Sequence, residues 1–278
     1  MSRRIRVVAL VAATVALAAV VPAQAGEKVL PGTCRVGHPK VVPPGCASSL
    51  LPPGALPNIV PKPPAYVSVG PDAIAFDPVG LVTTVDPNTK VLRFPTLVAN
   101  VGSVALELLG EPTADPERWR ALQCTSWATK ACLTRQEVGE LAWHAAHNHF
   151  HFQDFADYEL RRVLPDGTPD FSAGGQVATS PKVSFCLMDS EANSEDSPPQ
   201  TYVGCPGALQ GISAGWADLY DMGLPGQSLP IAGLADGLYA IVIRLDPTNR
   251  LLESNDGDNL AYSIVELYDN GNEARVIG

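Results

Sequence analysis

The sequence predicts an all-β protein, a β-sandwich of twisted antiparallel sheets with long loops and few short helices. Apolar, β-branched and aromatic segments alternate with turns rich in Gly, Pro, Asn and Asp over residues 65–278. The sequence shows neither a repeat of fixed period nor a glycine-rich phosphate loop after a strand. These observations together favour a sandwich of short strands.

Turn residues separate the expected strands along the chain. Examples are the Asp-Pro-Asn run at 86–88, the Asn-Val-Gly run at 100–102, the Pro-Asp-Gly run at 165–167 and the Asp-Pro pair at 246–247. The expected strands, in order, are 66–69, 81–85, 91–99, 104–108, 147–162, 183–188, 238–245 and 259–267. Two segments, 115–122 and 134–144, are expected to form short helices.

Residues 1–25 have the composition of a secretory signal peptide. Three arginines precede an apolar run at 7–21, and Ala23-Gln24-Ala25 supplies a small-residue cleavage site. The run is short and rich in alanine, which favours a cleaved signal over a retained membrane anchor, and no other stretch could span a bilayer. We therefore expect a secreted, extracellular protein with no integral membrane segment after the signal is removed.

Residues 26–64 contain ten prolines. Proline lacks the backbone N–H and fixes φ, so this density excludes helix and sheet interior and predicts an extended arm. The expected organisation is a signal at 1–25, the arm at 26–64 and one β domain at 65–278.

Net charge and cysteine content limit the classes of partner and the redox compartment that we expect for this protein. Loss of the three signal arginines takes the formal net charge from −10 to −13, which argues against nucleic acid and favours cationic partners, although it could equally serve solubility. Six cysteines in an exported chain predict disulfides. Many connectivities are open, and nearest-neighbour spacing favours Cys34–Cys46, Cys124–Cys132 and Cys186–Cys205.

Four of the five histidines lie between residues 144 and 151. Neutral imidazole is the commonest metal ligand and suits copper and zinc. In a β-strand, His147, His149 and His151 would share one face at steps of about 7 Å, whereas His144 has the opposite parity and would point elsewhere if the strand continued back that far. A metal site at the three alternating histidines is favoured over a solvated or hydrogen-bonded histidine face.

A second group rich in oxygen atoms lies near the carboxyl end. Glu253, Asn255, Asp258 and Asn259 fall within seven residues, a density that suits a hard cation such as calcium. An ordinary acidic turn is the alternative, because Asn, Asp and Gly also dominate turns for conformational reasons.

Several motifs resemble those of the lysyl oxidases, in the same order along nearly all of the mature chain. The most specific is WHAAHNHFHFQDFADYEL at 143–160, which is similar to the family's copper-binding segment. The others are LPNIVP at 56–61, LRFP at 92–95, KVSFCL at 182–187, QGI at 210–212, WADLY at 216–220 and ESNDGDN at 253–259.

The resemblance implies a secreted copper-dependent amine oxidase that converts primary amines such as peptidyl lysine to aldehydes with O2, releasing H2O2 and ammonia. His147, His149 and His151 would hold Cu(II), with His144 as the next candidate ligand. The self-derived cofactor of the family, lysine tyrosylquinone, maps onto Lys182 and Tyr220. Lys182 is also the only lysine after Lys130.

The resemblance also implies a calcium site. It does not decide which residue acts as the general base. The family's calcium residues map onto Asn58, Ile59, Glu253, Asn255, Asp258 and Asn259, so Ca(II) would be an additional ion. Asp218 and His144 are the candidates for the base.

The chain departs from the family pattern at two cysteine positions, which here are Ala146 and Gly215. The disulfide that braces the copper strand in animal members is therefore absent, and Cys186 would pair with Cys205. Two other classes remain open, namely a non-catalytic exported copper-binding protein and a structural extracellular module.

Overall fold

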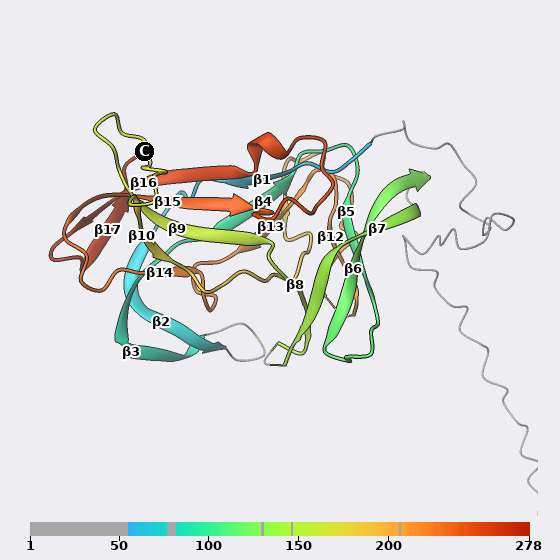
Figure 1. Cartoon of the computed structure of the whole chain (residues 1–278), viewed down its shortest axis with the longest axis horizontal. Helices are drawn as coiled ribbons and strands as arrows, with labels where there is room; N and C mark the ends of the chain where they lie inside the picture. Colours follow the sequence, from blue (N-terminus) through green and yellow to red (C-terminus); the bar gives the residue numbers. More distant parts are fainter. Residues whose placement is uncertain (1–54, 77–81, 129–130, 146, 206) are drawn as a thin grey trace, which may run out of the picture. The chain divides into compact units, whose positions relative to one another are not determined.

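The computed structural model describes residues 55–76, 82–128, 131–145, 147–205 and 207–278 (Figure 1). The expected signal peptide at 1–25, most of the expected arm and the expected Cys34–Cys46 bond lie outside the described residues.

Strands dominate the described part of the chain, and every strand pair in it is antiparallel. The all-β class is therefore confirmed. The element with helical geometry among these residues is the 3-10 helix η1 (Asp256–Asp258). Within the described ranges, no helix has the length and apolar character needed to cross a bilayer.

Four sheets make up the described part of the chain. The first has the order β1-β4-β13-β11 and comprises Ile59–Lys62, Thr96–Asn100, Trp216–Tyr220 and Glu191–Ala192. The second has the order β10-β9-β15-β16-β17 and comprises Gln176–Thr179, Ala156–Arg162, Gly237–Leu245, Leu260–Tyr268 and Glu273–Val276.

The third sheet has the order β12-β5-β6-β7-β8 and comprises Leu209–Ile212, Leu106–Glu111, Arg118–Ala128, Ala131–His144 and His149–Phe152. The fourth is small, with the order β14-β3-β2, and comprises Ser228–Pro230, Val82–Arg93 and Ser68–Phe76. Figure 1 shows β6 and β7 as long neighbouring strands, with β8 beside them.

One large apolar core joins these sheets and positions the site. Leu160 on β9 and Ile241 on β15 are register partners, and both are fully buried. The same core contains a chain of aromatic rings, in which Phe94 packs edge-on against Tyr158, and Phe185 packs against both Tyr158 and Tyr220. Edge-to-face contacts of this kind fix ring orientation, so the Phe185 ring holds the Tyr220 ring in one orientation.

The two expected helices are wrong. Residues 134–144 belong to β7, where Ala121 pairs with Gly139 and Leu122 pairs with Glu137. This shift leaves Val138 as the extra residue of a β-bulge. Val138 and Leu141 are both buried, so the bulge creates an inward spacing of three residues that imitates a helix.

Residues 115–122 form a turn followed by the start of β6. Thr113 Oγ1 donates to the carbonyl of Arg118, and Asp115 Oδ1 accepts from the backbone N–H of Glu117. The Asp-Pro-Glu run therefore begins one turn and not a helix, because pairing with β5 and β7 provides the backbone bonds of 118–128.

Other expected strands are divided or shortened. The segment 147–162 contains β8 and β9, separated by a turn at which Asp154 has φ 56°. The segment 91–99 is interrupted after Arg93. The segment 183–188 contributes a single bridge, Phe185 with Phe152, in place of a strand.

The end of the proline-rich segment is integrated into the fold. Residues 59–62 form β1, an edge strand, and the Ile59 side chain is fully buried. An edge position accommodates Pro61, which cannot donate a ladder bond. The backbone N–H of Ser254 donates to the carbonyl of Pro57, so this end of the segment lies against the turn that contains Glu253.

Candidate metal and cofactor site

A tight hairpin gathers the histidines. β7 ends at His144 and β8 begins at His149, and these two residues are register partners. The backbone N–H groups of His147 and Asn148 both donate to the carbonyl of His144, and Asn148 has φ 56°. The short turn therefore returns the chain onto itself within a few residues and places all four imidazoles at one end of the hairpin.

The imidazoles of His147 and His149 both approach the ring of His151. Its Nε2 lies 3.3 Å from Nδ1 of His147 and 3.0 Å from Nε2 of His149. Two nitrogens that each lie about 2.0–2.1 Å from one ion, at angles of about 90–110°, are separated by roughly 2.8–3.4 Å. Each of these separations fits a pair of nitrogens that share one ion, and ring nitrogens of His144, His147 and His151 all lie within 4.8 Å of one another.

His144 lies in the same cluster, because β8 begins at His149 and does not continue back to His144. Its ring stacks on His151 with centroids 4.7 Å apart and 17° between planes, and lies 4.2 Å from the ring of His147. The parity argument assumed a continuous strand, whereas the turn between β7 and β8 reverses the direction of the chain. Nδ1 of His144 is buried and has no hydrogen-bond partner among the described residues, so it is available to a ligand or an ion.

The surroundings keep the histidines neutral. Burial is the main cause that lowers the pKa of His147 to about 4, and it also lowers the pKa of His144, His149 and His151. Mutual repulsion adds to this effect. Neutral imidazole presents a lone pair, which is the form that binds a metal.

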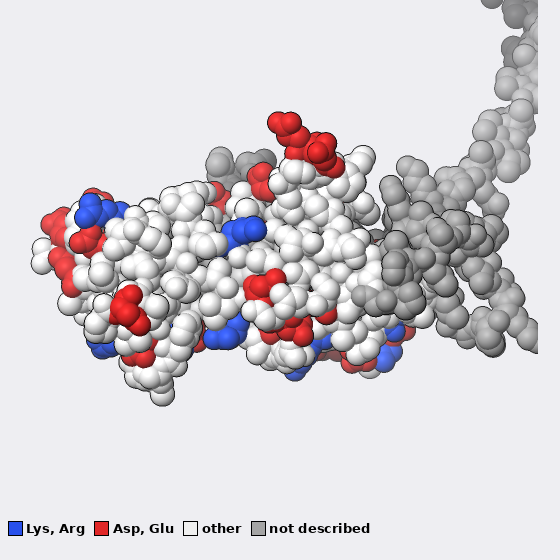
Figure 2. Space-filling view, turned by 90° about the horizontal axis from the view of Figure 1, so that it is seen from above, with Lys and Arg blue, Asp and Glu red and all other residues white. Residues whose placement is uncertain are grey.

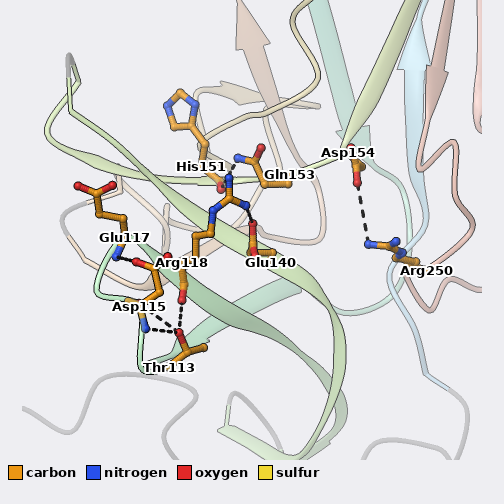
Figure 3. Close-up of polar contacts among 9 residues, drawn as sticks. All are labelled: Thr113, Asp115, Glu117, Arg118, Glu140, His151, Gln153, Asp154 and Arg250. Atoms are coloured by element: carbon orange, nitrogen blue, oxygen red, sulfur yellow. Dashed lines mark hydrogen bonds and ion pairs between the residues drawn. The ribbon is translucent and has the colours of Figure 1, made fainter.

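Polar side chains contact the backbone of β8 and surround it on the side away from the imidazoles. Figure 3 shows the Gln153 amide, which donates to the His151 carbonyl over 3.2 Å, and the nearby ion pair of Arg118 with Glu140. The His151 imidazole points away from these contacts (Figure 3). This side chain is 5% exposed, so it is the most buried of the four.

Backbone hydrogen bonds join β8 directly to the segment that carries Lys182. Phe152 and Phe185 exchange two backbone bonds, of 2.7 and 3.0 Å, and the N–H of Phe155 donates to the carbonyl of Val183 over 2.9 Å. Nδ1 of His151 lies 3.4 Å from Oγ of Ser184. The positions of the histidines and of Lys182 are therefore coupled through a few short contacts.

Lys182 and Tyr220 lie together. Nζ of Lys182 is 5.2 Å from the centre of the Tyr220 ring and 4.9 Å from that of Phe185. Tyr220 ends β13 and is 8% exposed, and its hydroxyl donates to the carbonyl of Cys186. Two residues 38 positions apart in the sequence thus meet beside the histidine cluster.

The electrostatics of this pair favour an uncharged amine. Burial lowers the pKa of Lys182 to about 8, and the carboxyl of Asp218 acts weakly in the opposite direction. Burial raises the pKa of Asp218 and of Tyr220. Asp218 is 1% exposed and accepts a bond from the N–H of Met188, so a buried carboxyl stands beside the lysine and the phenol.

Two disulfides are present in the described residues. Cys124–Cys132 joins β6 and β7, and Cys186–Cys205 joins the Lys182 segment to the loop before β12. The second bond holds Cys186, whose carbonyl accepts the phenolic hydrogen bond of Tyr220. It thereby supports the site.

The oxygen-rich turn near residue 255 packs against β1. Glu253 accepts from the N–H of Ile59 and from the amide of Asn259, and Asn58 donates to Asp258. Asn255 caps η1 by accepting from the N–H of Gly257. One side-chain oxygen on each of Asn58, Asp258 and Asn259 is buried without a partner among the described residues.

Sequence reasoning missed several residues that build the site. Phe185 packs between Lys182 and Tyr220, Ser184 contacts His151, and the turn at 225–227 contacts both members of the pair. No composition or periodicity signal distinguishes these residues, because their role depends on contacts between distant segments.

The fold and the site define an all-β protein with a histidine cluster beside a buried lysine–tyrosine pair. The family model described as lysyl oxidase matches residues 121–276, more than half of the chain. The chain therefore belongs to the lysyl oxidase family.

Named relatives are similar over shorter stretches. The chain is 31% identical to lysyl oxidase homolog 1 of Homo sapiens over 42% of its own length and 19% of the relative's. It is 29% identical to protein-lysine 6-oxidase of Gallus gallus over 62% of its own length and 33% of the relative's. The chain thus matches a third or less of the length of each of these two relatives.

Proposed function

We propose that this protein is a secreted copper-dependent amine oxidase that oxidises primary amines, such as the side chain of peptidyl lysine, to aldehydes with O2. Hydrogen peroxide and ammonia are the other products. The observation that carries the proposal is the position of the Lys182 amine, 5.2 Å from the Tyr220 ring centre, next to imidazole nitrogens separated by 3.0 and 3.3 Å.

His147, His149 and His151 would hold Cu(II). Nε2 of His151 lies close to a ring nitrogen of each of the other two, burial lowers the pKa of all three, and His144 offers an unpartnered nitrogen at the same cluster. Copper supplies one-electron chemistry with O2, and a quinone formed from Lys182 and Tyr220 supplies an electrophilic carbonyl that accepts electrons from an amine.

The chain's own residues orient the reaction and manage protons. Phe185 and the Cys186 carbonyl fix the ring and the hydroxyl of Tyr220. Asp218, whose pKa is raised by burial, can hold a proton close to Lys182 and Tyr220, which makes it the first candidate for the general base. His144, at the edge of the histidine cluster, is the second.

The surface charge fits a cationic substrate. The full sequence carries a net charge of −10, and Figure 2 shows one face on which Asp and Glu outnumber Lys and Arg. Such a surface attracts amines and lysine-rich peptides, and the attraction weakens as salt increases. The proposal of secretion rests on residues 1–25, outside the described part of the chain.

A peroxide assay with an amine substrate tests the activity. Copper-loaded parent protein should release H2O2 from a lysine-rich peptide, and a carbonyl reagent that traps quinones should block the release. Lys182→Ala and Tyr220→Phe should both be inactive at normal copper content. Peroxide production that survives Tyr220→Phe would assign the redox chemistry to copper alone and would exclude the quinone.

Peptide mapping separates the oxidase from a non-catalytic copper-binding protein and from a structural module. In an oxidase, Lys182 and Tyr220 occur in one cross-linked peptide after copper loading. Two ordinary peptides, in protein that binds copper fully, would favour the binder.

We also propose that the turn at 253–259 binds Ca(II) together with Asn58 and the backbone of Ile59. The unpartnered oxygens of Asn58, Asp258 and Asn259 support this assignment, because carboxylate and amide oxygens are calcium ligands. Glu253 and Asn255 complete an oxygen-rich set. Calorimetric titration with calcium tests it, and absence of binding heat and of thermal stabilisation would reject it.

A further inference from the structure

A short turn contacts both members of the lysine–tyrosine pair. It comprises Pro225, Gly226 and Gln227, and it is called the 225–227 turn below. The carbonyl of Pro225 lies 3.5 Å from Nζ of Lys182, and Nε2 of Gln227 donates to the carbonyl of Tyr220 over 3.3 Å. The turn therefore contacts the side-chain amine of Lys182 and the backbone carbonyl of Tyr220.

Gly226 is the point of closest approach. Its φ is +72°, and a Cβ added there would lie 2.8 Å from Cβ of Lys182, 3.4 Å from its Cδ and 3.5 Å from its Cγ. The nearest atom is the first carbon of the lysine side chain, which cannot move without its backbone. Only a residue without a side chain lets Lys182 lie flat on the turn and extend toward the ring.

Ser180 attaches the turn to the lysine backbone. Its Oγ donates to the carbonyl of Gly226 over 2.9 Å and accepts from the N–H of Lys182 over 3.2 Å. The Ser180 side chain is 8% exposed, so water competes little for these two bonds. The clamp fixes the distance between the turn and the lysine.

We propose that the 225–227 turn is a positioning element for cofactor formation, in which Gly226 sets the path of the Lys182 side chain toward the Tyr220 ring. This inference rests on the proposed function, because it concerns how the quinone precursor is assembled. Gly226, Pro225 and Ser180 act through Lys182 and contact no substrate.

The reaction that the turn would assist balances with dioxygen as oxidant. One O2 converts the Tyr220 phenol to an ortho-quinone and releases one water. The unprotonated Lys182 amine then forms a C–N bond to a ring carbon, and a second O2 accepts two electrons and two protons from the adduct and leaves as H2O2. The second step requires Nζ near a ring carbon, so a displaced lysine slows it. Misplacement by about 1 Å can reduce the rate of an oriented reaction by about 100-fold.

Gly226→Ala tests the proposal, and Gly233→Ala is its matched control. Gly233 has φ +80° and is exposed, and a Cβ there would meet nothing within 4 Å. Both substitutions introduce the same backbone strain, but only Gly226→Ala displaces Lys182. Protein produced without copper is loaded with Cu(II) in air, and the cross-linked Lys182–Tyr220 peptide is quantified by mass spectrometry against time. Bound copper and thermal stability are measured in parallel.

Gly226→Ala is expected to form the cross-link at least about tenfold more slowly than the parent at equal bound copper, whereas Gly233→Ala matches the parent. Ser180→Ala, which removes two hydrogen bonds without adding volume, should slow the cross-link as well. If Gly226→Ala does not fold, Ser180→Ala decides. Parent-like cross-linking in a folded Gly226→Ala, or in Ser180→Ala when that variant decides, overturns the positioning role. Absence of the cross-link in the parent itself instead refutes the proposed function.

Discussion

Replacing Lys182 with Met should stabilise the copper-free protein, because the fold holds this ammonium in an apolar place. Burial lowers the pKa of Lys182 from 10.5 to about 8. At about 1.4 kcal/mol per pKa unit, this shift corresponds to a penalty of about 3 kcal/mol for the charged form at neutral pH. Met has a similar shape and carries no charge.

The expected gain is smaller than the full penalty. The variant loses the contacts of the ammonium with the rings of Phe185 and Tyr220, each worth about 0.5–1 kcal/mol, and a long contact with Pro225. We expect the free energy of unfolding to rise by about 1–2 kcal/mol at pH 7.

The pH dependence follows from the direction of the shift. Between the folded pKa of about 8 and the unfolded value of 10.5, the folded parent binds fewer protons than its unfolded chain, so its stability increases with pH. The advantage of Lys182→Met is therefore complete below pH 8 and disappears as pH rises toward 10.5.

Urea unfolding of copper-free parent and variant at pH 7 and pH 10 measures both quantities. Lys62→Met is the matched control, because Lys62 is an exposed lysine at the edge of β1, and it should change little at either pH. A Lys182→Met variant that is less stable than the parent at pH 7, or whose gain does not decline with pH, would refute the reasoning.

Three further predictions concern the ions and the disulfide. His149→Ala should lower bound copper at least about tenfold in metal analysis, because it removes a ligand nitrogen that lies 3.0 Å from Nε2 of His151; copper content equal to the parent's would contradict the site. Calcium should raise the melting temperature more at pH 8 than at pH 5, because burial raises the pKa of Glu253 to about 7 and protons compete with the ion below that value. Glu253→Gln should reduce the stabilisation by calcium. Equal stabilisation at both pH values would argue against Glu253 as a ligand. Replacing both Cys186 and Cys205 with Ser should lower the free energy of unfolding by about 2–4 kcal/mol and slow Lys182–Tyr220 cross-linking. Replacing both Cys124 and Cys132 with Ser should lower stability without slowing cross-linking. Equal cross-linking rates in the two variants would show that Cys186–Cys205 does not support Tyr220.

Local pattern could predict the fold class and the composition of the histidine cluster. Strands such as β15 and β16 are continuous or alternating apolar runs between turn residues, and the density of histidines at 144–151 needs no tertiary information. The lysine and tyrosine could be assigned only by resemblance, because no local signal brings residues 182 and 220 together.

The errors arose where tertiary structure changes a local period. The bulge at Val138 gave β7 a helical spacing, and strand pairing on both sides then overrode helix propensity. The opposite parity expected for His144 applied only to a continuous strand, and the turn between β7 and β8 brings its ring to the other histidines. The role of Gly226 cannot be predicted from the sequence, because it depends on the Lys182 side chain that packs against it in the folded protein.

The two halves of the site differ in how much of the chain must be assembled to form them. The four imidazoles come from one hairpin, closed by a turn of a few residues, so a small loop-closure entropy opposes their gathering. Lys182 and Tyr220 meet only after β13 has paired with β4 and the 182–187 segment has bonded to β8. Capture of a metal by the imidazoles would thus be a local event during folding, whereas the Lys182–Tyr220 bond would form only after the distant segments have reached their final places. In a protein that matures itself, this order would leave incompletely folded chains without an oxidising cofactor.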